Sequence, residues 1–440
     1  MTPGAAKGLI TAAPASNNGK TVLTLGLIRA LSQAGHAVSS LKVGPDYIDT
    51  DFHRLASGRD CLNLDIWAMR EETLISQASA AGDSANLVIA EGLMGLFDGA
   101  LDGTGSTADA AAKLDWPVIL IADVKGQSAS AAALVEGFAR HREGVRLGGV
   151  IFNRVGSPRH EGILARAMEG LDVPVLGYVP NDSRLDLPSR HLGLVQAREH
   201  DDLAAWLDEA ARIIGGAVDL IQLVSLATSA ELPVAANSPP IPPLGQKIAV
   251  ARDDAFAFIY PHILDGWRRA GSEVSFFSPL ADDAPNETCD AIYLPGGYPE
   301  LHAGKLAGNQ NFLASLRDAA SDSKTIFGEC GGYMVLGENL TDADGDTHTM
   351  ARLLPLRSDF AKRKLHLGYR QIDVLSDGAL GPAGTKLRGH EFHYASYAET
   401  PGKGAKPLFT VSDALSENEQ SAGLQVGSVA GSFIHLIDRV

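Results

Sequence analysis

Cys330 has the strongest chemical context in the sequence. It stands in GECGG at residues 328–332, after the apolar segment TIF and before YMVLGENL, which has a helical pattern. A nucleophile on a sharp strand-to-helix turn needs small neighbours, because the backbone is crowded there. The N-terminus of the following helix would also favour the thiolate. We therefore predict that Cys330 is an acyl-transfer nucleophile, whereas Cys61 and Cys289 lack such glycines and are predicted to be structural.

Two other segments could complete such a site. LPGGYPE places Gly297 just after a predicted strand, where its backbone N–H could stabilise a tetrahedral oxyanion. A cysteine nucleophile requires a base, and His435 ends an apolar strand in GSFIHLID. His390 and His393 in GHEFHY are alternative bases. With Glu391 they could also form an H-x-x-H metal site, but the nearby sequence offers no third ligand, which favours a structural or substrate-shaping role.

A second set of residues resembles a phosphate-binding loop. The first apolar segment runs into PASNNGKT and then into a helical leucine pattern. In that context Gly19, Lys20 and Thr21 are predicted to bind ATP, with Thr21 reaching Mg²⁺. Asn153, at the end of a later apolar segment, is assigned to the same nucleotide site. The usual glycine five positions before Gly19 is Pro14 here, so either the loop is longer by one residue or an ordinary helix is capped at this point.

Acidic residues follow the other predicted strands. Glu91 ends NLVIAEG, at the usual position of an acid that holds Mg²⁺ or its water. LKVGPDYIDTDFH sets Asp46 and Asp49 beside Lys42, and EGLMGLFDG adds Asp98. Acids at the carboxyl ends of adjacent parallel strands can hold a metal and orient a substrate. Together these segments predict a Mg·ATP site.

The elements that position these residues form two predicted α/β domains. Near-continuous apolar segments alternate with helical stretches over residues 1–224, which indicates a buried parallel sheet. Residues 225–245 are rich in proline and are predicted to be a linker. The alternation restarts over residues 246–440 and becomes more β-like towards the C-terminus. Because the two halves share no glycine signature, we expect them to do different chemistry.

Composition excludes several classes of protein. The net charge of −16 disfavours binding to nucleic acids and anionic membranes. The apolar segments fall short of the roughly 18 residues of a membrane span. Three cysteines cannot form a disulfide framework, and no signal peptide is evident. We therefore predict a cytoplasmic protein, and the sequence leaves open whether it is a homo-oligomer.

The combined motifs resemble those of the two-domain glutamine-dependent amidotransferases of corrinoid synthesis. Within them the chain is most similar to the cobyrinate or hydrogenobyrinate a,c-diamide synthase family, on KVGPDYIDTDFH, EGLMGLFDG, LPSRHLGL, DDAFAFIYP, LPGGYPELH, ECGGYMVLG and GHEFHY. The N-terminal half also resembles dethiobiotin synthetase, which shares the longer loop. The resemblance implies a P-loop-type parallel sheet domain followed by a class I glutamine amidotransferase-like α/β domain.

The resemblance also implies roles for residues. Cys330 would be the nucleophile and His435 its base, while the acceptor carboxylate would be served by residues of the first domain, namely Asp46, Tyr47, Asp49 and Asp98. Triad amidotransferases usually carry glutamate two residues beyond the histidine, where this chain has Ile437. His435 would therefore act without an orienting carboxylate or use another, such as Asp438.

The implied reaction has two parts. Glutamine would be hydrolysed in the C-terminal domain, and Mg·ATP would activate the a and c acetates of a corrinoid polycarboxylate in the N-terminal domain. Local cations would receive this polyanion, namely Lys42, Arg54 or Arg190. Amidation of another tetrapyrrole, such as a nickel sirohydrochlorin, is an alternative. A deviant P-loop ATPase switch with an inert second domain is another, although the intact GECGG argues against inertness.

Overall fold

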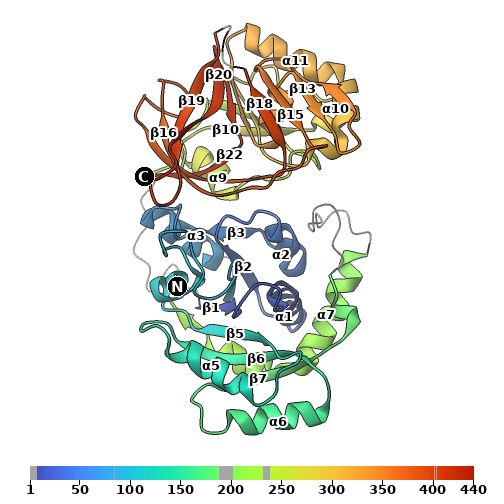
Figure 1. The fold of residues 1–440 in the computed structure, drawn as a ribbon, viewed down its shortest axis with the longest axis vertical. Coiled ribbons are helices and arrows are strands. Elements are labelled where there is room, and N and C mark those ends of the chain that lie inside the picture. Colours follow the sequence, from blue (N-terminus) through green and yellow to red (C-terminus); the bar gives the residue numbers. More distant parts are fainter. Residues whose placement is uncertain (1–6, 84, 188–201, 231–237, 401, 403) are drawn as a thin grey trace. The chain divides into compact units, whose positions relative to one another are not determined.

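The chain divides into two compact units (Figure 1). The structure, a computed structural model, describes residues 7–83, 85–187, 202–230, 238–400, 402 and 404–440. One unit comprises Met1–Trp67 and Glu71–Ala235, and the other comprises Ala68–Arg70 and Ala236–Val440. The division near residue 235 falls within the proline-rich segment. Among the described residues, no helix has both the length and the apolar character required to cross a membrane.

The first unit is built on a sheet whose described strands lie in the order β3-β2-β4-β1-β5-β6-β7. These strands pair in parallel, and β8 adds to β1 in the antiparallel sense. Every residue of β2 and β4 is buried, as expected of a parallel sheet covered on both faces. The predicted parallel sheet is therefore confirmed. The strands are β1 (Lys7–Ala12), β2 (Val38–Val43), β3 (Cys61–Leu64), β4 (Leu87–Glu91), β5 (Val118–Asp123), β6 (Leu147–Val155), β7 (Val175–Pro180) and β8 (Thr228–Ser229).

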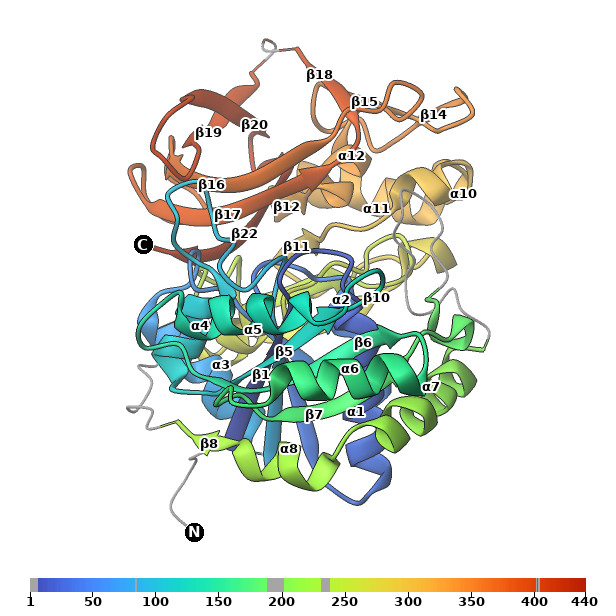
Figure 2. The same cartoon turned by 60° about the horizontal axis from the view of Figure 1, so that its bottom comes forward.

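Helices connect these strands. They are α1 (Lys20–Gln33), α2 (Asp49–Ser57), α3 (Glu71–Asp83), α4 (Thr107–Leu114), α5 (Ser130–Arg140), α6 (Pro158–Met168), α7 (Leu203–Ala217) and α8 (Leu220–Leu226). Helices α1 and α7 pack closely because Gly26 leaves room, since a Cβ there would lie 2.3 Å from the Cδ1 atom of Ile214. Helices α5 and α6 lie side by side (Figure 2).

The carboxyl ends of the parallel strands bring polar residues into a row. Lys42 of β2 is the register partner of Glu91 of β4, and Asp123 of β5 is the partner of Asn153 of β6. The loop after β1 begins between these pairs, because β1 lies between β4 and β5. Ligands of such sheets bind outside the carboxyl ends of the strands.

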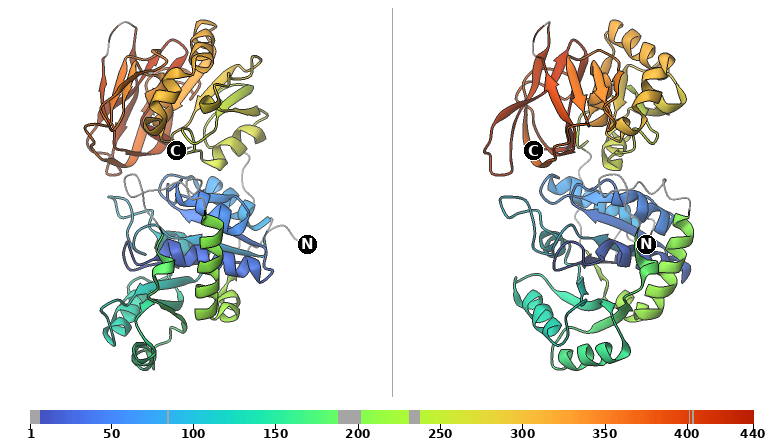
Figure 3. Two further views of the ribbon diagram at one scale, coloured as in Figure 1. Left: turned by 90° about the vertical axis from the view of Figure 1, so that its right-hand side faces the viewer. Right: turned by 45° about the vertical axis from the view of Figure 1, so that its right-hand side comes forward.

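The second unit contains a mixed sheet in the order β10-β9-β11-β12-β21-β20-β19-β16-β17-β22 among its described strands. Strands from β10 to β21 in this order pair in parallel, and the remaining neighbours are antiparallel. This confirms the α/β start and the β-rich C-terminal part. The red strands gather on one side of the unit and the orange helices lie beside them (Figure 3).

The strands of this mixed sheet are β9 (Lys247–Ala251), β10 (Glu273–Phe277), β11 (Ala291–Leu294), β12 (Thr325–Glu329), β16 (His366–Val374), β17 (Lys386–His393), β19 (Lys406–Ser412), β20 (Gln420–Val426), β21 (Val429–Ser432) and β22 (Ile434–Arg439). A smaller sheet contains β13 (Asn339–Thr341), β14 (Thr347–Thr349), β15 (Leu356–Asp359) and β18 (Ser396–Glu399). The helices are α9 (Pro261–Arg269), α10 (Ala303–Gly308), α11 (Gln310–Ser321) and α12 (Gly331–Leu336).

The helix after Cys330 is shorter than its sequence pattern predicts. The apolar pattern extends over YMVLGENL, but α12 ends at Leu336 and β13 begins at Asn339. Gly337 marks the change, because a Cβ at this residue would lie 2.7 Å from the carbonyl oxygen of Leu356. Close approach of a neighbouring strand therefore ends the helix.

Candidate active sites

The loop between β1 and α1 is held by residues from distant parts of the first unit. Gly19 has a φ of 82°, and a Cβ there would lie 2.3 Å from Asn153 Nδ2. Asn153 Nδ2 in turn donates a hydrogen bond of 2.9 Å to the carbonyl oxygen of Asn18, and Lys20 Nζ donates one of 3.0 Å to that of Met94. The predicted nucleotide residues Gly19, Lys20, Thr21 and Asn153 therefore lie at one loop.

Glu91 is the centre of a buried polar network. Thr21 Oγ1 donates a hydrogen bond of 2.6 Å to Glu91 Oε1, and Lys42 Nζ lies 2.9 Å from the same oxygen. His53 Nε2 lies 2.6 Å from Glu91 Oε2. Thr21 and Glu91 together offer a hydroxyl and a carboxylate oxygen, which are hard donors of the kind that Mg²⁺ prefers, so this donor set fits a magnesium ion.

Charges in the network stabilise one another. Burial opposes the charged form of Lys42, but the carboxylates of Asp49 and Glu91 outweigh it and raise the pKa of Lys42. Burial likewise opposes ionisation of Glu91, but Lys42 and His53 outweigh it and lower the pKa of Glu91. Lys42 and Glu91 are therefore an ion pair. Burial, with the charge of Lys42, lowers the pKa of Lys20 to about 8.

Lys42 requires a correction as a substrate-binding cation. Its side chain is only 2% exposed and donates to Asp49 Oδ2 at 2.6 Å as well as to Glu91. A buried ammonium group with two carboxylate partners cannot receive a polyanion from solvent. We assign it to positioning the acids instead. Arg190, another of the predicted substrate-binding cations, lies outside the described residues.

The remaining predicted acids occupy two turns. Asp46 Oδ1 accepts hydrogen bonds from the backbone N–H groups of Ile48 at 2.9 Å and Asp49 at 3.1 Å, at the start of α2. Burial and the nearby Asp49 raise the pKa of Asp46 to about 6. Tyr47, in the same turn, is buried. Asp98 is exposed, and its Oδ2 accepts a hydrogen bond of 2.9 Å from Gly95, next to the carbonyl oxygen of Pro14 in the phosphate loop.

In the second unit, Cys330 occupies a sharp turn between β12 and α12. Its φ of 47° is unusual for a residue other than glycine. Glycines around it are required by close packing, because a Cβ at Gly332 would lie 1.9 Å from the carbonyl oxygen of Leu294. The Cys330 N–H donates a hydrogen bond of 2.8 Å to the carbonyl oxygen of Ser432.

The two glycines of LPGGYPE lie against both the cysteine turn and the histidine. A Cβ at Gly331 would lie 3.0 Å from the backbone nitrogen of Gly297, and a Cβ at Gly296 would lie 2.3 Å from Cε1 of His435. The Gly296–Gly297 segment therefore contacts the turn that carries Cys330 and the ring of His435. This placement suits an oxyanion-binding role for the Gly297 N–H.

The surroundings of Cys330 in this structure oppose the expected thiolate. Burial, reinforced by the nearby carboxylate of Glu300, raises the pKa of the Cys330 thiol, and the short helix α12 does not offset this effect. Burial also lowers the pKa of His435 to about 3. Burial in this structure therefore opposes the thiolate that the sequence context favours, and it also favours a neutral imidazole, which can accept a proton.

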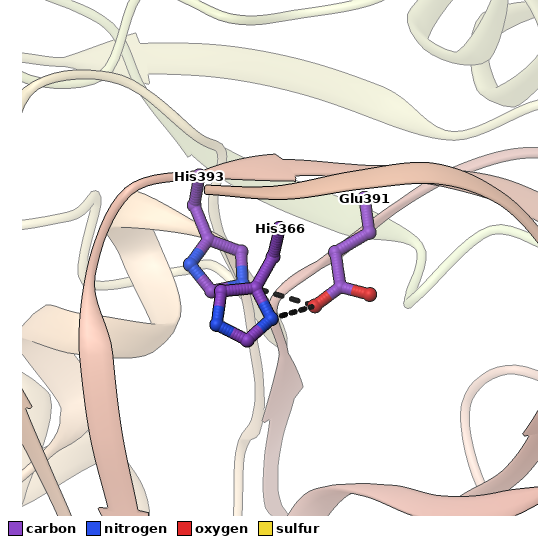
Figure 4. A group of neighbouring side chains, drawn as sticks. All are labelled: His366, Glu391 and His393. Carbon is purple, nitrogen blue, oxygen red and sulfur yellow. Dashed lines mark hydrogen bonds and ion pairs between the residues drawn. The ribbon is translucent and has the colours of Figure 1, made fainter. Parts of the chain in front are cut away.

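Three side chains of the β16–β17 pair form a separate cluster (Figure 4). His393 Nε2 lies 2.9 Å and His366 Nδ1 lies 3.9 Å from Glu391 Oε1. The two imidazole rings stack with centroids 4.6 Å apart and planes 7° from parallel. Because the lone pair of an imidazole lies in the ring plane, stacked rings cannot direct both lone pairs at one ion. The sequence offered no third ligand near GHEFHY, but the structure supplies His366, and the possible ligand atoms of the three residues lie within 4.8 Å of one another. Arg370 binds the other oxygen of Glu391, Oε2, at 2.7 Å, so this carboxylate already has a cationic partner. The structural role of GHEFHY stays a prediction.

Two residues of these sites were not singled out from the sequence. His53 binds Glu91 Oε2, and Glu329 lies beside His435, 4.0 Å from Oε2 to Nδ1. His53 stands in DTDFH and Glu329 in GECGG, two of the motifs that indicate the sites. Membership of these motifs could have indicated a functional role for each residue. Their partners could not be predicted, because Glu91 is 38 residues from His53 and His435 is 106 residues from Glu329 in the chain.

Comparison with known proteins places both units. Residues 9–195 match the CobQ/CobB/MinD/ParA nucleotide binding domain, and residues 247–439 match the CobB/CobQ-like glutamine amidotransferase domain. A protein of Brucella anthropi named hydrogenobyrinate a,c-diamide synthase is 55% identical over 98% of each chain. Proteins of the same name from Rhizobium meliloti, 53% identical over 98% of this chain and 99% of theirs, and Rhodobacter capsulatus, 51% identical over 98% of each, are also similar. The chain belongs to the hydrogenobyrinate a,c-diamide synthase family, in which a nucleotide-binding domain is joined to a glutamine amidotransferase domain.

Proposed function

We propose that this protein converts hydrogenobyrinate to its a,c-diamide, with ATP as the energy source and glutamine as the nitrogen donor. The observation that carries the proposal is full-length similarity to proteins of that name, which spans both units. The names of the relatives favour hydrogenobyrinate, the cobalt-free ring acid, over cobyrinate.

Glutamine is hydrolysed in the second unit. The proton of the Cys330 thiol passes to the imidazole of His435 as the sulfur attacks the side-chain amide carbon. The Gly297 N–H stabilises the oxyanion of the tetrahedral adduct. The C–N bond then breaks, ammonia leaves with the proton held by His435, and water hydrolyses the thioester to glutamate.

The acceptor carboxylate is activated in the first unit. A carboxylate oxygen attacks the γ-phosphorus of ATP, the bond to ADP breaks, and an acyl phosphate results. Lys20 and the N–H groups of the loop at Gly19 bind the phosphates. Thr21 and Glu91 would hold Mg²⁺, which would neutralise phosphate charge. Asp46, Asp49 and Asp98 orient the acceptor and ammonia, which displaces phosphate to give the amide.

The substrate requires cations that are exposed. With Lys42 buried, Arg54 is the remaining described candidate of the three, because its side chain is 34% exposed although it also contacts Asp51. Arg190 stays a prediction. Tyr47 is buried and would shape the pocket through packing.

The test is a reconstitution with defined substrates. The purified protein is incubated with Mg²⁺, ATP, glutamine and either hydrogenobyrinate, cobyrinate or nickel sirohydrochlorin, and products are identified by mass spectrometry. We expect two acid-to-amide conversions of hydrogenobyrinate. Cys330→Ala should lose synthesis from glutamine and retain synthesis from ammonium chloride. Diamide formation only from the nickel compound, or equal loss with both nitrogen sources, would contradict the proposal.

A further inference from the structure

The histidine of the proposed glutaminase site lacks the acid usually found two residues later. That position is Ile437, an apolar residue that is fully buried. Asp438, the alternative considered from the sequence, is bound elsewhere, because its two carboxylate oxygens accept hydrogen bonds of 2.9 Å from the backbone N–H and Nε of Arg70. Asp438 therefore cannot orient this imidazole.

Glu329 approaches His435 from a different strand. Its Oε2 atom lies 4.0 Å from His435 Nδ1, and the two side chains are 3% and 0% exposed. A contact at Nδ1 leaves Nε2 as the nitrogen that can take the proton of a thiol. The distance is longer than a hydrogen bond but lies within the roughly 4–6 Å over which an opposite charge favours the charged form of a group.

The Glu329 carboxylate is itself held in place. Tyr293 Oη donates a hydrogen bond of 2.7 Å to Oε2, and the backbone N–H of Leu436 donates one of 3.2 Å to Oε1. Leu436 directly follows His435, so this bond ties the carboxylate to the strand that carries the histidine. The surroundings are otherwise apolar and include Trp267 and Phe327. These two hydrogen bonds, rather than contacts with solvent, therefore fix the orientation of the Glu329 carboxylate.

We propose that Glu329 is the positioning residue of the glutaminase site, orienting His435 through Nδ1 in place of the acid that this chain lacks at residue 437. This inference rests on the proposed function, since it assigns a partner to the proposed base. The role of Glu329 follows from the negative charge of its carboxylate. When the Cys330 proton reaches Nε2, an imidazolium forms in a buried site, and an opposite charge within 4–6 Å stabilises it. A carboxylate accepting from Nδ1–H also fixes the tautomer that leaves Nε2 free.

The surrounding titratable groups make the role measurable. Glu329 faces Tyr293 and His435. Besides burial, the charges of His390 and His393 lower the pKa of His435, and that of Glu391 raises it. Burial raises the pKa of Glu329 to about 8, while the hydrogen bond from Tyr293 opposes that rise. Since the carboxylate is the working form, glutaminase activity should increase with pH as Glu329 ionises. Removing the Tyr293 hydroxyl should raise the pKa further and move this increase to higher pH.

The experiment compares three variants of the full-length protein in a glutaminase assay. Glu329→Gln keeps the volume and removes the charge, and we expect kcat to fall at least roughly 100-fold with little change in the KM for glutamine. Synthesis from ammonium chloride should be unchanged. Tyr293→Phe should keep substantial activity but shift the rising part of the pH profile upward. Glu338→Gln, the same substitution at a residue paired with Arg357 on the surface, serves as the matched control.

The outcomes separate this inference from the proposed function. An unsubstituted protein without glutaminase activity would refute the proposed function and this inference with it. Glutaminase activity in Glu329→Gln within about twofold of the unsubstituted value would refute the inference alone. If Glu329→Gln does not accumulate as folded protein, Tyr293→Phe decides, and an unchanged pH profile would overturn the assignment.

Discussion

Lys42 Nζ lies 2.9 Å from Glu91 Oε1 in the interior of the first unit, and the two side chains are 2% and 0% exposed. They are register partners on β2 and β4, so the parallel sheet itself brings them together. Glu91 also accepts hydrogen bonds from Thr21 and contacts His53. The acid predicted to hold Mg²⁺ or its water is therefore also part of the buried interior of this unit.

Glu91→Gln should accordingly affect both stability and synthesis. Removing one member of a buried ion pair typically costs about 3–5 kcal/mol. The remaining contact of Lys42 with Asp49, at 2.6 Å, should reduce that cost. We expect a lower denaturation midpoint for the full-length protein and no diamide from ATP and ammonium chloride. Urea denaturation and mass spectrometry measure the two effects. A variant with an unchanged midpoint would show that the ion pair contributes little to the fold.

Asp46→Asn is the matched comparison, because it also replaces an acid by its amide in the same site. The asparagine side-chain oxygen can still accept from the N–H groups of Ile48 and Asp49, so the start of α2 should be preserved. We expect a change in unfolding free energy below about 1 kcal/mol together with loss of ammonia-dependent synthesis. Normal synthesis would show that Asp46 only caps the helix.

His435→Asn should lower glutaminase kcat by a factor on the order of 10² or more, because it removes the proposed general base. His390 is the control, since it is the register partner of His435 on β17 and has a pKa lowered by burial to about 4. We expect His390→Asn to retain most of the activity. If His390→Asn lost glutaminase activity and His435→Asn retained it, His390 would be the base. Both should keep synthesis from ammonium chloride.

Alkylation of Cys330 should be slow at neutral pH. Burial raises the pKa of its thiol, so the reactive thiolate fraction should still rise about tenfold per pH unit at about pH 9, where a free cysteine, with a pKa of about 8.5, is already mostly thiolate. The rate is followed by mass spectrometry with iodoacetamide, and Cys330→Ala identifies labelling at Cys61 and Cys289. A plateau below pH 8 would indicate a stabilised thiolate instead.

Chelation should separate the two reactions. EDTA is expected to abolish ATP-dependent synthesis from ammonia, since Mg·ATP is the proposed substrate, and to leave glutamine hydrolysis unchanged. Added Mg²⁺ should restore synthesis. Loss of glutaminase on chelation, together with the same loss in His366→Asn, would show that His366, Glu391 and His393 rearrange to hold a metal.

The sequence alone predicted much of this protein because the relevant signals are local. A buried parallel strand must be apolar throughout, and GECGG and PASNNGKT each place a reactive residue at a turn that a few neighbouring residues define. The α/β class, the elbow at Cys330 and the phosphate loop at Lys20 could therefore be read from short segments. Glycines at 296 and 297 could likewise be placed after a strand, although their contacts could not.

Only the tertiary structure decided how groups far apart in the chain affect one another. Strand order makes Lys42 a partner of Glu91 and removes it from the surface, and the pairing of β17 with β16 brings His366 to Glu391. Burial raises the pKa of the Cys330 thiol, although its local sequence favoured a thiolate. Charge states and side-chain partners depend on desolvation and distance, which arise only when separate strands pack together, and so no single segment of the sequence contains them.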